Sequence, residues 1–178
     1  MWDQGVPLEH WEEQGEVRVG SLPDTSLGQL PLKVFSLGYN AMGDRSTGLA
    51  MVRAWRRAYG ERVNVIILAW DSLAGHALYE YDDAARNAID VGTYFGLCLA
   101  SLSLEQGVRP DLTHLVGFSL GAHLVGASGR AYTTTTGLRL ARLTGLDPAI
   151  GRFFGVVSPP EVQNQKLAAL PELVTIIP

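Results

Sequence analysis

The chain has 178 residues, of which 47% are hydrophobic and 18% are charged, against about 25% charged in an average soluble domain. This balance excludes a disordered chain and permits one buried core. The net charge of −4 argues against a nucleic-acid partner, and the longest apolar run, Val65 to Trp70, is too short for a transmembrane helix.

Residues 1–31 are polar and interrupted by glycine and proline, with one short alternating segment at 16–19. We predict an N-terminal edge strand and turns in this region. The first ten residues have neither the basic nor the apolar region of a signal peptide, so we expect none. Residues 32–178 contain no repeat or linker and are predicted to form a single domain.

Short apolar segments alternate with helical patterns from residue 32 onward. The first two, at 32–37 and 63–70, are rich in β-branched residues, which is typical of strands buried on both faces. Between them, apolar residues recur every three or four positions, and this spacing predicts a helix that ends at Gly60.

The most regular helical pattern extends from about residue 83 to residue 106. Its apolar residues step by three or four positions and form one stripe. We expect Asp82 or Asp83 to cap its first N–H groups and Gly107 to end it.

Three further strands are predicted at 114–118, 142–146 and 173–177, with a helix at about 120–129 after the first of them. Alternating strands and helices indicate right-handed crossovers, and therefore an α/β fold with a mostly parallel sheet flanked by helices. In such sheets, functional residues gather at the carboxyl ends of the strands.

Metal and disulfide chemistry is not indicated by the sequence. The chain has one cysteine, Cys98, so we expect no internal disulfide and no metal cluster of cysteine and histidine. The neighbours of Cys98 are apolar, which favours an inert core thiol. We expect no cofactor.

Residues 117–121 read Gly-Phe-Ser-Leu-Gly, a G-x-S-x-G pattern where a predicted strand passes into a helix. A sharp turn there would lift the Ser119 hydroxyl clear of the sheet, and Gly117 and Gly121 would let the chain pass without a Cβ. The helix that follows would direct its first N–H groups at developing negative charge. The alternative is a glycine-rich turn with an ordinary capping serine.

The segment HLVGFSLGAHLVGASGR, followed by RLTGLDPA, resembles the core of the pancreatic-lipase family of secreted α/β-hydrolases. The resemblance continues upstream in VNVIILAW and covers most of residues 15–178. It implies an α/β-hydrolase fold, a lipid-ester substrate met at a lipid–water interface, and an extracellular location. Because ELVTIIP resembles the family's next strand, it also implies that the fold is truncated after the strand that follows the catalytic aspartate.

The resemblance implies that Ser119 is the nucleophile and that Asp147 is the acid of a catalytic triad. The residues themselves agree, because Asp147 follows a predicted strand and the separation from Ser119 leaves room for one helix and one strand. An Asp-Pro turn without catalytic importance is the alternative.

An oxyanion hole is expected from two backbone N–H groups, those of Leu120 and Tyr39. The family's usual His-Gly-aromatic motif is Leu37-Gly38-Tyr39 in this chain. The backbone donors are kept, but the hydrogen bond of the imidazole is lost, which puts the rigidity of this loop in question.

The triad's base is missing, because no histidine follows Asp147. His10 lies in the polar N-terminal segment, and His114 opens a strand at the far end of the sheet. His123 is expected to be a core histidine bonded to the backbone. His76 is the only conceivable substitute, although a solvated loop histidine is its ordinary interpretation.

The leading hypothesis is a carboxylic-ester hydrolase that acts on triglycerides or phospholipids, with its base absent from this chain. The alternatives are a catalytically inactive binding or storage protein of yolk-protein type, or a fragment whose last strand is an unprotected edge. An apolar mouth around Tyr39, Phe153 and Phe154 would suit acyl chains, unless both phenylalanines are core residues.

Overall fold

The computed structural model describes residues 28–40, 45–70, 73–75, 77 and 80–150, and the short strands at 3–4, 20–21 and 174–177. The segment 16–19, predicted as an edge strand, lies outside these residues. The elements in chain order are β1 (Asp3–Gln4), β2 (Gly20–Ser21), β3 (Leu32–Ser36), α2 (Arg45–Tyr59), β4 (Asn64–Leu68), α3 (Tyr81–Gln106), the 3₁₀ helix η4 (Pro110–Leu112), β5 (Thr113–Phe118), α4 (Leu120–Thr136), β6 (Arg142–Leu146) and β7 (Val174–Ile177).

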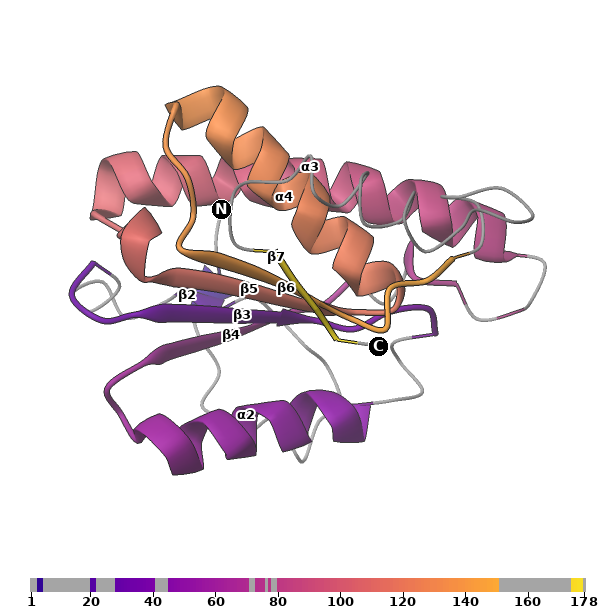
Figure 1. Cartoon of the computed structure of the whole chain (residues 1–178), viewed down its shortest axis with the longest axis horizontal. Coiled ribbons are helices and arrows are strands. Elements are labelled where there is room, and N and C mark those ends of the chain that lie inside the picture. Colours follow the sequence, from indigo (N-terminus) through magenta and orange to yellow (C-terminus); the bar gives the residue numbers. More distant parts are fainter. Residues whose placement is uncertain are drawn as a thin grey trace.

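Five strands form one parallel sheet in the order β4-β3-β5-β6-β7, and β1 pairs with β2 separately. The register is continuous across the centre of the sheet, where Phe35 pairs with Ile67 on one side and Val116 on the other. Helices α3 and α4 cover one face and α2 covers the opposite face (Figure 1). The predicted α/β class and the parallel sheet are confirmed.

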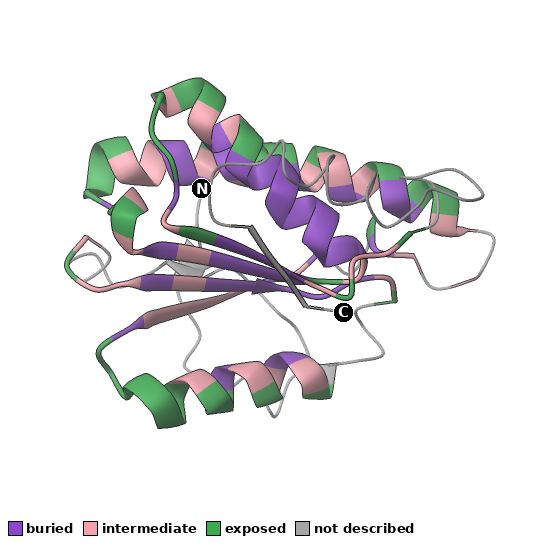
Figure 2. Cartoon of the chain, viewed as in Figure 1, coloured by how far each residue is buried: buried purple, intermediate pink, exposed green. Residues whose placement is uncertain are grey.

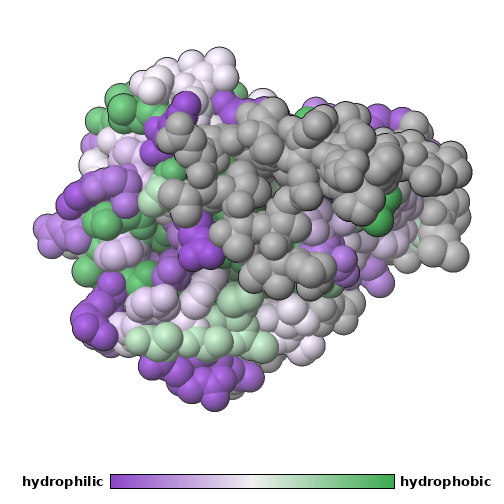
Figure 3. All heavy atoms as spheres, in the orientation of Figure 1, coloured by the Kyte–Doolittle hydropathy of each residue, from purple (hydrophilic) through white to green (hydrophobic). Residues whose placement is uncertain are grey.

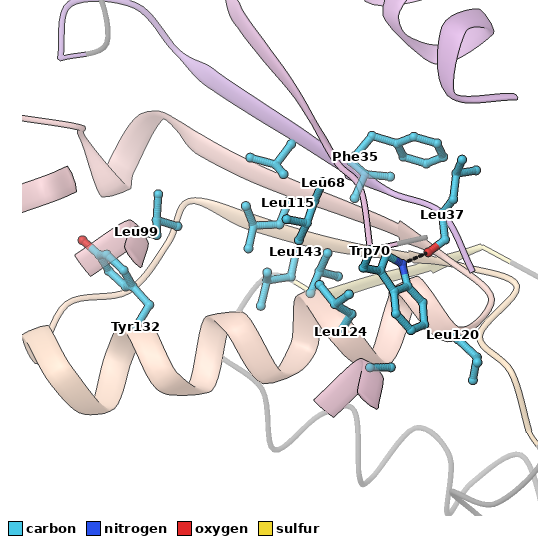
Figure 4. Packing of buried hydrophobic residues seen from close by; sticks show 14 of the residues in the cluster. Phe35, Leu37, Leu68, Trp70, Leu99, Leu115, Leu120, Leu124, Tyr132 and Leu143 are labelled. Atoms are coloured by element: carbon cyan, nitrogen blue, oxygen red, sulfur yellow. Dashed lines mark hydrogen bonds between the residues drawn. The ribbon is translucent and has the colours of Figure 1, made fainter. Parts of the chain in front are cut away.

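The core lies chiefly between the sheet and α4. Leu115 and Leu143 point from the sheet toward Leu124 of α4, and all three are nearly inaccessible to solvent (Figure 4). Buried residues line the side of α4 that faces the sheet, whereas exposed residues dominate α2 (Figure 2). Hydrophilic atoms border the lower edge of the molecule, where α2 lies (Figure 3). The described helices include none that is long and apolar enough to span a bilayer.

Helices α3 and α4 pack closely because glycines face the partner helix. A Cβ at Gly92 would clash with the carbonyl oxygen of Leu124, and one at Gly96 would clash with that of Ser128. The buried side of α3 therefore consists largely of alanine and glycine. Cys98 is half-buried rather than a core residue, which corrects the prediction, because it lies beside this small-residue face.

Two helix boundaries differ from the predictions. Helix α3 begins at Tyr81, so Asp82 and Asp83 lie in its first turn and neither is its cap. There they still face the positive end of the helix dipole. Helix α4 continues past Gly129 to Thr136, because Gly129 packs against Leu143 within the helix and does not end it.

Candidate active site

Ser119 occupies the turn between β5 and α4 with a strained backbone. Its φ of 53° and ψ of −120° lie in a region that residues with a Cβ rarely adopt. Ser119 stands at the N-cap position of α4, but its side chain makes no capping hydrogen bond to the first turn of that helix. The conformation is therefore that of a sharp strand-to-helix turn and differs from that of an ordinary capping serine.

The two glycines around Ser119 allow the backbone of neighbouring segments to approach. A Cβ on Gly117 would lie 2.6 Å from the backbone nitrogen of Ala122, and one on Gly121 would lie 2.6 Å from the carbonyl oxygen of Leu37. Real Cβ atoms do not approach backbone this closely, so both positions need glycine for steric reasons.

Asp147 lies beside the serine turn at the carboxyl edge of the sheet. Phe118 of β5 pairs with Leu146 of β6, and the residues that follow them are Ser119 and Asp147. The backbone N–H of Ser119 donates to the carbonyl oxygen of Leu146 at 3.0 Å. Asp147 has a positive φ of 41°, so the backbone bends sharply where β6 ends. The Asp147 residue is exposed at this bend.

His123 holds the segment that follows Asp147. Its Nε2 donates to the carbonyl oxygen of Ala149 at 2.7 Å, from a side chain that is only 7% exposed. Burial lowers the pKa of this imidazole, and the bond to Ala149 opposes that shift. The prediction of a core histidine bonded to the backbone is confirmed.

The loop after β3 packs on the first turn of α4. A Cβ on Gly38 would lie 2.7 Å from the Cβ of Ser119 and 3.1 Å from the backbone nitrogen of Leu120. The ring of the next residue, Tyr39, packs against that of Tyr81 at a tilt of 58°, with 5.3 Å between the ring centroids. The backbone at 38–39 and the N-terminus of α4 thus lie next to the serine.

His114 lies at the other end of the sheet, where the sequence predicted it. It pairs in register with Lys33 and Arg142, and its Nε2 lies 2.8 Å from Thr144 Oγ1. Burial lowers its pKa to about 4, and the charges of Lys33 and Arg142 add to the shift. His114 is therefore neutral near pH 7 and remote from Ser119.

His10, His76, Phe153 and Phe154 lie outside the described residues. The described part of the chain contains no group of three His, Cys, Asp or Glu residues that could hold a metal ion.

Trp70 is a residue of this site that was not among the predicted ones. Trp70 is buried just after β4, and its indole Nε1 donates to the carbonyl oxygen of Leu37 at 2.9 Å (Figure 4). The strand at 63–70 was predicted to be buried on both faces, but β4 is an edge strand whose residues are mostly half-buried. A tryptophan at the carboxyl end of this predicted strand was the available signal, because a buried indole N–H needs an acceptor.

A family model described as "Lipase" matches residues 27–163. The chain belongs to the lipase family. Pancreatic lipase-related protein 2 of Rattus norvegicus is 40% identical over 103 residues, which are 58% of this chain and 20% of that protein. Vitellogenin-3 of Drosophila melanogaster is 41% identical over 66 residues, which are 37% of this chain and 16% of that protein. Esterase PE8, a solved structure, has a TM-score of 0.46 and 18% identity, with 87% of this chain and 86% of that chain covered.

The expected relationship to the pancreatic-lipase family is confirmed, and with it the α/β-hydrolase fold of the parallel sheet. The matched region spans about a fifth of the length of the pancreatic lipase-related relative.

Proposed function

We propose that the chain carries the nucleophilic part of a serine carboxylic-ester hydrolase that acts on lipid esters. The observation that carries this proposal is the strained backbone of Ser119, held between Gly38 and Leu146 at the sheet edge. Strain of this kind costs about 1–3 kcal/mol and is typical of functional sites. Asp147, on the bend that follows Leu146, is the proposed triad acid.

In the proposed reaction, Ser119 Oγ attacks the ester carbonyl carbon while a base accepts the hydroxyl proton. The N–H groups of Tyr39 and Leu120 stabilise the negative charge on the carbonyl oxygen. The intermediate collapses to an acyl-serine, and the alcohol leaves with the proton from the base. Water then attacks the acyl-serine in the same manner and releases the carboxylic acid.

The base of this reaction has no established source in the chain, because no residue after Asp147 is a histidine. Asp147 would orient such a base and stabilise its protonated form. Without one, a serine site keeps a residual acceleration of about 10³–10⁴ over water. We therefore propose low esterase activity for the chain alone, with His76 as a remote substitute.

Lipid esters are proposed as substrates because apolar side chains are exposed near the candidate site. Leu73, Phe118 and Ile150 are 45%, 36% and 54% exposed. Leu73 follows β4, Phe118 is the last residue of β5, and Ile150 follows β6. The carboxyl ends of these three parallel strands lie at the same edge of the sheet. We propose from the family relationship that the substrate is met at a lipid–water interface outside the cell, and that residues 32–178 act as one domain.

Labelling with a fluorophosphonate tests this proposal. We expect mass spectrometry to find a single adduct on Ser119, absent in Ser119→Ala and retained in Ser101→Ala, whose serine lies on the exposed side of α3. Added imidazole should accelerate labelling and the hydrolysis of p-nitrophenyl butyrate in the native chain more than in Ser119→Ala. A folded chain that stays unlabelled, with or without imidazole, contradicts the proposal.

The second candidate is a binding or storage protein that has lost catalysis. The similarity to Vitellogenin-3 and the replacement of the family's histidine by Leu37 favour it. It predicts that the folded chain binds lipid esters or fatty acids without reacting with the phosphonate.

A further inference from the structure

The loop at 37–40 carries the Tyr39 N–H and lacks the imidazole that the family has at position 37. We propose that Trp70 is a positioning residue that holds the 37–40 loop, and with it the Tyr39 N–H, against the serine turn. This inference rests on the proposed function, because it concerns one of the two oxyanion donors.

The carbonyl oxygen of Leu37 is the point at which Trp70 holds the loop. This oxygen lies against α4, where a Cβ on Gly121 would come within 2.6 Å of it. It accepts from Trp70 Nε1 at 2.9 Å and from Ser36 Oγ at 3.3 Å. The indole bond is the shorter of the two, and its donor is only 4% exposed. A buried carbonyl that lost this donor would lose its better partner.

Trp70 is well placed for this task because β4 and β3 are neighbours in the sheet. Their carboxyl ends therefore adjoin, and a side chain that follows β4 reaches the loop that follows β3. The indole is a large rigid group with one donor, and its ring belongs to the buried core (Figure 4). The position of the Leu37 carbonyl is thus tied to the core.

Two further hydrogen bonds join the same pair of segments. The backbone N–H of Asn40 donates to the carbonyl oxygen of Ala74 at 3.1 Å, and the Tyr39 hydroxyl donates to that of Ala77. The 37–40 loop is therefore held at its beginning by Trp70 and at its end by Asn40. The Tyr39 N–H lies between these two points, so both bonds limit its displacement from Ser119.

Trp70→Phe tests the proposal, because phenylalanine keeps an aromatic ring and removes the N–H. Trp55→Phe is the matched control, since Trp55 lies on α2 and packs edge-on against Phe35. We expect the Asn40 amide to exchange with solvent about five- to tenfold faster in Trp70→Phe, as for the loss of one hydrogen bond. The Gly137 amide, bonded to Thr133 at the far end of α4, should keep its rate in both variants.

The second readout is the rate at which the phosphonate labels Ser119. We expect it to fall about tenfold in Trp70→Phe and to stay unchanged in Trp55→Phe, because a displaced donor stabilises the adduct less well. Faster exchange at Asn40 and Gly137 alike would mean a global structural role and would overturn the proposal. So would an unchanged labelling rate despite faster exchange at Asn40.

If the native chain is not labelled, the proposed hydrolase function fails, and the Asn40 exchange rates alone decide whether Trp70 holds the loop. If Trp70→Phe does not fold, 3-benzothienylalanine incorporated at position 70 serves in its place, because it keeps the bicyclic ring and replaces only the N–H that bonds to Leu37 by sulfur. An Asn40 amide that exchanges at the native rate in this variant then overturns the proposal.

Discussion

The backbone N–H of Ser119 donates a hydrogen bond to the carbonyl oxygen of Leu146 at 3.0 Å. Leu146 immediately precedes Asp147, so this main-chain bond joins the serine turn to the strand that ends at the candidate acid. The sheet pairing of Phe118 with Leu146 continues into this bond. The relative position of Ser119 and Asp147 is therefore set by backbone pairing, and side-chain contacts are not needed to establish it.

The strained backbone of Ser119 predicts an unusual order of stability among its variants. Ser119→Gly should exceed Ser119→Ala in free energy of unfolding by about 1 kcal/mol. Relief of the backbone strain contributes about 1–3 kcal/mol, and the greater freedom of glycine in the unfolded chain opposes it by about 0.5–1 kcal/mol. Urea denaturation of both variants measures the difference. An alanine variant as stable as the glycine variant would show that the turn is not strained.

Substitution of Gly121 tests the close approach of the loop to α4. Gly121→Ala should lower the free energy of unfolding by about 2–3 kcal/mol, because its Cβ would lie 2.6 Å from the carbonyl oxygen of Leu37. Gly48→Ala is the control, since the nearest atom to its Cβ is the flexible end of Ile67 at 3.2 Å. The control should be neutral or stabilising, given the higher helix propensity of alanine. Equal losses in both variants would refute the prediction.

The contact between α3 and α4 should depend on the absence of a side chain at Gly92. Gly92→Ala is expected to cost about 1–3 kcal/mol of stability, because a Cβ would lie 2.9 Å from that of Ala127 and closer still to the Leu124 carbonyl. Leu104→Ala, at a position on α3 that is 77% exposed, should change stability by less than about 0.5 kcal/mol. Thermal unfolding measures the stability of both variants. If Gly92→Ala were as stable as Leu104→Ala, the two helices could move apart without cost and the prediction would be wrong.

His114 should make the folded state less stable in acid. Its pKa is about 4 in the folded chain and about 6.5 when unfolded, so between these values the unfolded state binds the proton more readily. Its contribution to stability is therefore complete above pH 6.5 and is lost as the pH falls toward 4. The full shift would correspond to about 3 kcal/mol, and the partial exposure of the ring reduces this to about 1–2 kcal/mol.

The comparison of the native chain with His114→Gln isolates this effect. The variant does not titrate at this position, so the stability of the native chain relative to it should fall between pH 7 and pH 4.5. His123, whose pKa is also lowered by burial, contributes equally to both proteins and cancels. A difference that is independent of pH in urea denaturation would exclude His114 as the source.

Element types and strand positions could be predicted from the sequence because they depend on local spacing. The strand at 142–146 was predicted with the bounds that it has, and α3 ends at Gly107 with the left-handed φ of 71° that a terminal glycine favours. The end of α4 could not be predicted from local signals, because Gly129 resembles a stop in the sequence but serves as a packing site against Leu143.

By itself, the amino-acid sequence determined the α/β class, the serine turn, the candidate acid and the family. These features depend on short patterns whose residues lie next to one another in the chain. The tertiary structure alone decided that Trp70 bonds to Leu37, 33 positions away, and that His123 holds the segment after Asp147. Such contacts follow from strand order and helix placement, which bring together residues that no local pattern relates.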